Sequence, residues 1–141
     1  MTTMTLHALL EVLLEMQGTF VLCNAHGSLE FKGPDLYVRP YQEWLTLYHS
    51  TAANPESQSH LHLKWPTFHR AVVTHEAGKT PALAFYGPAD AGEDAPLLWY
   101  FPSFCNWANG QTEIPEHIAQ YETFVTTYGT TLHLVAPSAT A

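Results

Sequence analysis

Histidines are the residues of this 141-residue chain with the widest range of chemistry, and nine are present. His60 and His62 stand two apart in a run, Ser59 to Trp65, in which apolar and polar side chains alternate. In a β-strand this spacing places both imidazoles on one face, with their Cα atoms about 6.5–7 Å apart. Two such imidazoles can share a metal ion, contact one larger ligand, or lie half-exposed on the strand without a ligand. The sequence leaves these three interpretations open.

Other catalytic arrangements are only weakly indicated. A metal site would need a third ligand, for which His75 with Glu76 is one candidate. Cys23 lies in an apolar run and Cys105 in a predicted loop, and neither belongs to a Cys-x-x-Cys pair. The sequence contains no glycine-rich phosphate-binding motif. We therefore expect a binding protein rather than an enzyme, with a metal-dependent small-molecule enzyme that uses the histidine pair as the less favoured alternative.

Composition narrows the classes of partner. Hydrophobic residues make up 46% of the chain and charged residues 13%, which excludes intrinsic disorder and a coiled coil. Five Lys and Arg residues against thirteen Asp and Glu residues give a net charge of −8. Binding to nucleic acid or to an anionic membrane surface depends on clustered basic side chains. We expect neither partner.

The N-terminal sequence predicts a cytoplasmic protein. No Lys or Arg precedes Lys32, and Glu11 and Glu15 interrupt the only apolar stretch near the start. A secretory signal combines a basic start with an uninterrupted apolar segment, and a membrane-spanning helix needs about 20 apolar residues. Two cysteines cannot make a disulfide framework, so the thiols are expected to be reduced.

The elements that must position the histidines are predicted from periodicity. Leucines at helical spacing predict an amphipathic helix over residues 5–17, with Thr5 as N-cap and Gly18 as the stop. Residues 19–23 and 28–32 predict a hairpin around a glycine-containing turn. Four further strands, at 59–65, 68–75, 81–86 and 97–101, are predicted to form an antiparallel meander. A second helix is predicted at 114–128, with Pro115 in its first turn and Gly129 as its stop.

The remaining segments are less regular. Residues 41–48 are compatible with either a short helix or a strand. Loops are predicted at 51–59, 87–96 and 103–112, and a flexible tail at 137–141. The whole chain, 1–141, suits a single domain, because two separate cores would each be small. The predicted fold class is α+β: an antiparallel β-sheet meander with N- and C-terminal helices packed on it.

The order of several short motifs resembles a repeat of the haem-utilisation family typified by HemS, HutX and ChuX. The similarity covers roughly residues 6–104. It comprises a leucine-rich opening helix, a glycine before an apolar strand, an Asn-containing turn, a short strand with an acidic residue and a glycine, a strand leading to a tryptophan, and two later aromatic strands. These motifs are Ala8–Leu14, Gly18–Leu22, Asn24–His26, Leu29–Gly33, His60–Trp65, Ala84–Gly87 and Leu97–Phe101. The chain resembles a single-repeat member of this family.

The resemblance implies a haem- or tetrapyrrole-binding protein that acts in intracellular haem or iron utilisation. In such a site a flat ligand lies against an apolar sheet face, an imidazole ligates the iron, and basic side chains contact the propionates. His60 or His62 is then expected to ligate the haem iron, with Lys64 and Arg70 as propionate partners. Because Lys and Arg are scarce, the alternative is an interaction or structural protein of the same fold that has lost the ligand.

The resemblance also implies self-association. Members of the family often carry two such repeats packed together, whereas this chain carries one. A lone repeat leaves an aromatic sheet face or a terminal strand uncovered, and a two-fold axis would cover the same patch on both copies. We expect a homodimer with the strand around Leu97 to Phe101 near its interface.

Overall fold

The computed structural model describes residues 2–50, 54, 58–88 and 95–138 of the chain. Within these residues the chain forms two α-helices, α1 (Leu6–Leu13) and α2 (Pro115–Tyr128). It also forms two short 3-10 helices, η2 (Trp65–Thr67) and η3 (Trp107–Asn109). The strands are β1 (Thr2–Thr5), β2 (Thr19–Asn24), β3 (Gly27–Phe31), β4 (Leu36–Tyr41), β5 (Trp44–His49), β6 (Leu61–Lys64), β7 (Arg70–Thr74), β8 (Ala82–Tyr86), β9 (Leu97–Tyr100), β10 (Cys105–Asn106), β11 (Thr112–Glu113) and β12 (Thr131–Val135).

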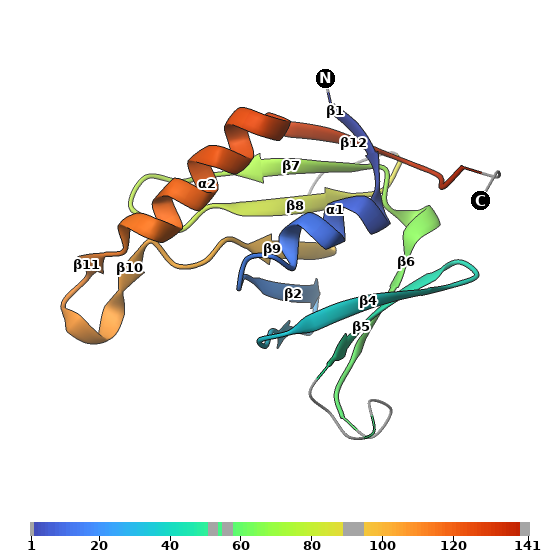
Figure 1. Cartoon of the computed structure of the whole chain (residues 1–141), viewed down its shortest axis with the longest axis horizontal. Helices are drawn as coiled ribbons and strands as arrows, with labels where there is room; N and C mark the ends of the chain where they lie inside the picture. The colour runs from blue at the N-terminus through green and yellow to red at the C-terminus, as the bar shows by residue number, and fades with distance from the viewer. Residues whose placement is uncertain (1, 51–53, 55–57, 89–94, 139–141) are drawn as a thin grey trace.

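The larger sheet has seven described strands in the order β1-β12-β7-β8-β9-β2-β3. Of the four strands predicted as one antiparallel meander, β7, β8 and β9 follow one another in this sheet, with Leu83 opposite Trp99. The first of the four, β6, pairs with β5 in a separate sheet instead. The predicted β2–β3 hairpin extends one edge, where Asn24 Oδ1 accepts hydrogen bonds from the amides of His26 and Gly27 at 2.7 and 3.2 Å. At the other edge, β1 pairs in parallel with β12 (Figure 1). The predicted α+β class is confirmed.

The smaller sheet has the order β4-β5-β6 and lies beside α1 (Figure 1). Strands β4 and β5 form a hairpin whose turn residue Gln42 has a φ of 52°. Strand β6 pairs with β5, with His62 opposite Thr46. Residues 41–48, for which a helix and a strand were both possible, therefore comprise the last residue of β4, a turn and most of β5. Pro40 lies in β4, an edge strand, where proline is tolerated.

Helix α1 begins at Leu6 because the Thr5 side chain accepts a hydrogen bond from the amide of Ala8 at 3.0 Å, as predicted for an N-cap. The helix ends at Leu13, before the predicted end at residue 17. The amides of the next turn bond back three residues instead of four, which tightens and ends the helix. Helix α2 is followed by Gly129 at a φ of 82°, as predicted for its stop.

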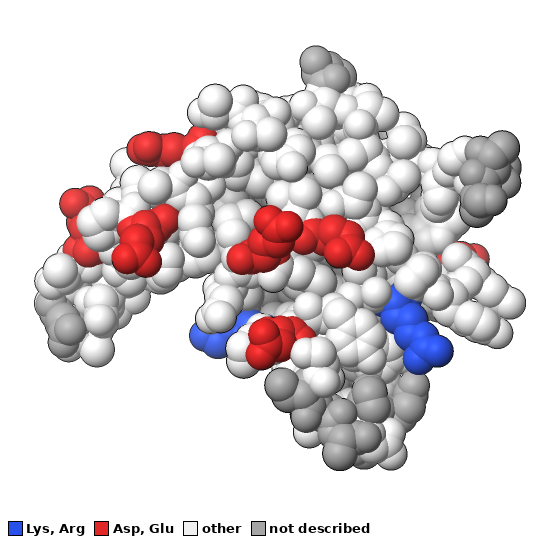
Figure 2. All heavy atoms as spheres, in the orientation of Figure 1, with Lys and Arg blue, Asp and Glu red and all other residues white. Residues whose placement is uncertain are grey.

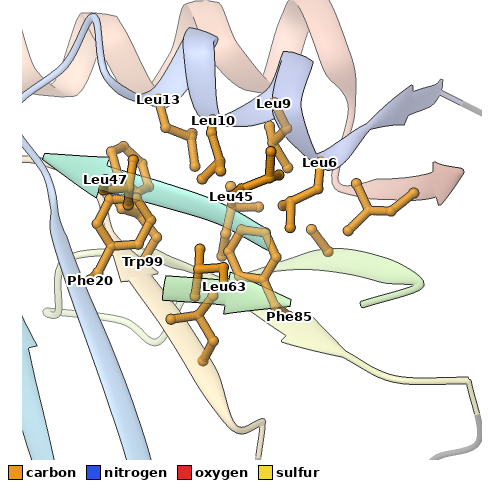
Figure 3. Packing of buried hydrophobic residues seen from close by; sticks show 14 of the residues in the cluster. Leu6, Leu9, Leu10, Leu13, Phe20, Leu45, Leu47, Leu63, Phe85 and Trp99 are labelled. Atoms are coloured by element: carbon orange, nitrogen blue, oxygen red, sulfur yellow. The ribbon is translucent and has the colours of Figure 1, made fainter. Parts of the chain in front are cut away.

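The hydrophobic core fills the space between the two sheets and the helices. Figure 3 shows the leucines of α1 directed toward leucines of the smaller sheet and toward aromatic rings of the larger one. The labelled members are Leu6, Leu9, Leu10, Leu13, Phe20, Leu45, Leu47, Leu63, Phe85 and Trp99. Phe124 of α2 joins them, with its ring centroid 5.3 Å from that of Phe101. Each such side chain contributes about 1.5–3 kcal/mol relative to exposure, so packing fixes the inner face of the smaller sheet.

Five of the described strands were not predicted: β1, β4, β12 and the two short strands β10 and β11. Strands β1 and β12 are short, and each is stabilised by a partner far away in the sequence. The segment 103–112, predicted as a loop, contains most of the small β10–β11 hairpin. Parts of the predicted loops and tail, at 51–53, 55–57, 89–94 and 139–141, lie outside the described residues.

Candidate functional site

The outer face of the smaller sheet carries aromatic, imidazole and basic side chains in register. Strand pairing places Tyr37 of β4 beside Tyr48 of β5. It also aligns two rows across the three strands, Arg39–Thr46–His62 and Tyr41–Trp44–Lys64. His60, one residue before β6, adds a second imidazole. We call this set the outer face: Tyr37, Arg39, Tyr41, Trp44, Thr46, Tyr48, His60, His62 and Lys64. Between them, Leu45, Leu47, Leu61 and Leu63 are buried in the core, and Val38 packs against it.

Aromatic contacts connect the rings of the outer face. His60 and His62 meet edge to face, with ring centroids 4.8 Å apart and planes at 86°. The ring of Tyr48 lies 5.2 Å from that of His60, and the ring of Trp44 lies 6.2 Å from that of His62. A further contact of 5.7 Å joins Tyr37 to Tyr48. The structure therefore brings the two predicted imidazoles together within an aromatic setting.

Each of these imidazoles makes a hydrogen bond through its Nδ1 atom. His60 Nδ1 lies 2.8 Å from the backbone carbonyl oxygen of Gln58. Because a carbonyl only accepts, His60 Nδ1 carries the proton, and the neutral ring keeps its lone pair on Nε2. His62 Nδ1 lies 2.8 Å from the hydroxyl of Thr46, which can donate or accept. Of the two, His60 is the imidazole already arranged to ligate a metal through Nε2.

Two of the five basic residues of the chain, Arg39 and Lys64, belong to the outer face. Lys64 Nζ lies 5.7 Å from the ring centroid of Trp44 and 3.6 Å from a carboxylate oxygen of Glu43. Figure 2 shows most acidic groups of that view over α1 and α2, with basic groups on the side where β4 lies. An anionic ligand would therefore meet positive charge at this sheet although the protein as a whole is acidic.

The outer face is also hollowed. Arg39, Tyr41, Trp44, Thr46, Tyr48 and His62 line a space of about 520 Å³, and small-molecule sites span about 300–1,000 Å³. Several of the large hydrophobic side chains that are exposed in the described structure lie here, Tyr41 being 69% exposed. Exposed aromatic side chains gathered on one face are typical of a binding surface.

Arg70, the other predicted propionate partner, lies on the larger sheet. It stands opposite Tyr86 in the β7–β8 pair, and its guanidinium carbon is 4.6 Å from the centroid of that ring. Its neighbour Ala71 is fully buried in the core, so alternation directs Arg70 to the face of the larger sheet that points away from the core. The structure thus groups Lys64 with the two histidines and places Arg70 elsewhere.

His75, the candidate third metal ligand, does not join the histidine pair. Its ring lies 5.8 Å from that of Phe104 and 5.5 Å from that of Tyr121, against α2. Burial raises the pKa of the Tyr121 phenol above its ordinary value. The ring of Tyr121 also contacts those of Phe101 and Phe104, so His75 lies in an aromatic cluster apart from the histidine pair. Across the described part of the chain, no group of three or more His, Cys, Asp or Glu side chains is arranged to hold a metal ion.

A second hollow, of about 460 Å³, lies between the start of α1, the β4–β5 hairpin, η2 and the end of β12. Its lining is mainly apolar, and the two imidazoles at its border are engaged. His69 Nε2 lies 3.2 Å from the carbonyl of Pro66, and His7 Nε2 lies 3.1 Å from a carboxylate oxygen of Glu11. No described Lys or Arg lines this hollow. It offers an anionic ligand no counter-charge, so the outer face is the stronger candidate.

Arg39 and the aromatic residues of β4 and β5 were not predicted as site residues. Alternation along β4 could have indicated this strand. Leu36, Val38 and Pro40 alternate there with the outer-face residues Tyr37, Arg39 and Tyr41. The hairpin was missed because its turn uses Gln42 in the left-handed region, a residue that is not typical of such turns. Without that hairpin, β5 could not be placed next to the histidines.

The arrangement defines the class of fold: an α+β domain with a large sheet, a smaller sheet and two helices around one core. Two solved structures of ChuX share this fold. One, described as the structure of the haem-binding protein ChuX, matches with a TM-score of 0.61 and 14% identity, covering 86% of this chain and 71% of that chain. The other, a crystal structure of ChuX, matches with a TM-score of 0.60 and 14% identity, covering 85% of this chain and 69% of that chain. The predicted ChuX-like fold is confirmed.

Other comparisons add little to this likeness. No family model matches the chain, and no curated protein matches it. At 14% identity the similarity to ChuX establishes the fold alone. Within the described residues, neither helix is long and apolar enough to cross a membrane.

Proposed function

We propose that the chain binds haem or a closely related metallo-tetrapyrrole on the outer face of the smaller sheet. His60 carries this proposal, because its Nδ1–H is bonded to a backbone carbonyl and its Nε2 is left to ligate iron. One of the ChuX structures with the same fold is described as a haem-binding protein, which supports this class of ligand. Haem would supply the iron, and the chain would supply its ligand and surroundings.

The aromatic residues supply the surface that a planar ligand requires. From strand geometry, the outer face extends about 10 Å across its three strands and about 13 Å along them. Tyr41 and Trp44, 69% and 37% exposed, would lose much of that exposure under a flat ring. Burial of aromatic surface against the ligand would contribute most of the binding free energy.

Basic residues on the same face would hold the propionates. The guanidinium of Arg39 can pair with a carboxylate through two parallel hydrogen bonds, whereas Lys64 acts as a point charge. Arg70, favoured as a propionate partner from the sequence, stacks on Tyr86 of the other sheet. A substitution of Arg70 therefore tests which basic residue serves this role.

Haemin titration followed in the Soret region tests the proposal. Wild-type protein should shift the Soret band at one haem per chain, and His60→Ala should remove the ligated spectrum and lower the affinity at least about tenfold. His62→Ala should keep the band position. His26→Ala is the control, because His26 lies exposed in the β2–β3 turn. A wild-type protein without a Soret shift, or a shift unchanged when both histidines are replaced by Ala, would contradict the proposal and favour a protein that has lost the ligand.

A role in intracellular haem or iron utilisation extends this proposal. Cys23 and Cys105 are both free and half-buried, which fits a reducing compartment such as the cytoplasm. Fractionation of cells that express the chain at native levels should place it in the cytosolic fraction. Recovery from a secreted or membrane fraction would contradict this part of the proposal.

We also propose that two copies associate through the side of the larger sheet that faces away from the core. Alternation in β9 buries Trp99 at 1% exposure and leaves Tyr100 at 39%, with the half-buried Leu98 on the same side as Tyr100. Such a patch suits a two-fold contact between identical surfaces. Light scattering at micromolar concentration should give the mass of two chains, and of one chain for Tyr100→Glu. A single-chain mass for wild-type protein that stays constant on concentrating rejects the dimer.

A further inference from the structure

The imidazoles of His60 and His62 lie at the separation that a shared metal ion imposes. A metal–nitrogen bond of about 2.1 Å places each ring centroid about 3.2 Å from the ion. Two ligands at an angle of about 90–109° then have centroids about 4.5–5.2 Å apart. The observed separation is 4.8 Å. We infer that the pair forms a chelating site for a divalent transition-metal ion, an inference that does not depend on haem binding.

Hydrogen bonds at Nδ1 fix the orientation of both imidazole rings. Gln58 accepts from His60, and the hydroxyl of Thr46 lies 2.8 Å from His62 Nδ1. In the chelate, both imidazoles ligate the metal ion through Nε2. His62 Nδ1 then donates its hydrogen bond to the hydroxyl of Thr46. Thr46 is only 5% exposed, so its hydroxyl is fixed by the surrounding structure. Such partners orient a ligating imidazole and raise its affinity for the metal, which makes Thr46 a positioning residue.

The surroundings select the class of ion. The two ligands are imidazole nitrogens, which disfavours Mg²⁺ and Ca²⁺ because these ions prefer oxygen ligands. Two imidazole nitrogens favour Cu²⁺ most strongly among first-row divalent ions, with Zn²⁺ weaker. Since the described residues offer no third acidic, thiol or imidazole ligand, water fills the remaining positions and the bound ion stays open to small ligands.

Titration of the haem-free protein with Cu²⁺, followed by electron paramagnetic resonance, tests the chelate. One Cu²⁺ ion should bind per chain. Its spectrum should show superhyperfine splitting from two ligand nitrogens. The ion should also quench tryptophan fluorescence, since the ring of Trp44 lies 6.2 Å from that of His62. Zn²⁺ should displace Cu²⁺ only in excess. A signal from one nitrogen or none, or several equivalent ions per chain, overturns the inference.

Variants separate this site from the proposed haem site. His60→Ala and His62→Ala should each lower Cu²⁺ affinity at least about tenfold, whereas only His60→Ala should remove the ligated haem spectrum. His26→Ala should bind Cu²⁺ like the wild type. Wild-type Cu²⁺ affinity in either His60→Ala or His62→Ala, or an equal loss in His26→Ala, overturns the chelate. Cu²⁺ bound as described by a protein without a Soret response would refute the haem proposal alone.

Thr46 provides a further check on the geometry. Thr46→Val, which keeps the shape and removes the hydroxyl, should weaken Cu²⁺ binding by about 10–100-fold while the two-nitrogen signal persists. Thr46→Ser keeps a hydroxyl and should restore the affinity, which distinguishes a positioning role from a general loss of structure. Wild-type affinity in Thr46→Val would overturn the role given to Thr46.

Discussion

The two faces of the smaller sheet are made by the same three strands and differ in burial and in chemistry. Inward-pointing Leu45, Leu47, Leu61 and Leu63 are between 0% and 5% exposed, whereas Tyr41 on the outer face is 69% exposed. Packing against α1 holds the inner face, and hydrogen bonds and ring contacts organise the outer one. Since neighbouring residues in a strand belong to different faces, substitutions one position apart should separate stability from binding.

The largest effect is expected from Leu47→Ala. Leu47 is fully buried, so its truncation should lower the free energy of unfolding by about 2–5 kcal/mol. Tyr41→Ala, on the exposed side, should stay within about 0.5 kcal/mol of wild type but weaken haemin binding. Urea unfolding followed by circular dichroism measures the first quantity and Soret titration the second. Similar losses of stability in both variants would show that the two faces are not separated.

A smaller loss of stability is expected where the chain packs closely against Trp99 of the larger sheet. A Cβ atom at Gly18 would collide with the ring of Trp99 and with the backbone carbonyl oxygen of Tyr100. Gly18→Ala should therefore lower the free energy of unfolding by about 1–3 kcal/mol. Gly27→Ala is the matched control, because a Cβ there meets no described atom within 4 Å. Thermal unfolding of the pair tests this, and equal stability of the two variants would contradict the close packing at Trp99.

The smallest effect is expected from the basic side chains. Arg39→Gln should lower haemin affinity by about two- to fivefold, the range for an exposed ion pair of about 0.5–1 kcal/mol, and the loss should shrink at high salt. Arg70→Gln should leave the affinity unchanged, because its guanidinium lies on the other sheet over Tyr86. A larger loss from Arg70→Gln would place the ligand away from the outer face.

Local patterns in the sequence predicted the elements that local interactions determine. The leucine spacing and Thr5 cap predicted α1, Pro115 and Gly129 predicted α2, and apolar alternation predicted the meander. The histidine pair followed from the two-residue period of a strand. These features depend on residues close to one another in the chain.

The assembly of the candidate site depends on contacts between distant parts of the chain, which no local sequence pattern indicates. Arg39 joins the histidines only through β5, and β5 is aligned by a turn in which Gln42 adopts a conformation that non-glycine residues rarely use. The orientation of the His60 ring comes from the carbonyl of Gln58, a backbone group without a sequence signal. The likeness to a haem-binding fold suggested a ligand but could not assign Arg39 a place beside it.

The parallel pairing of β1 with β12 bears on how the chain folds. Thr2 stands opposite Leu132, so this contact closes a loop that includes almost every other element. Closing so long a loop carries a large entropic penalty, and contacts of this kind slow folding. We expect β1 to dock last and to open first, so in hydrogen exchange the amides of β1 should lose protection well before those of the β7–β8 pair.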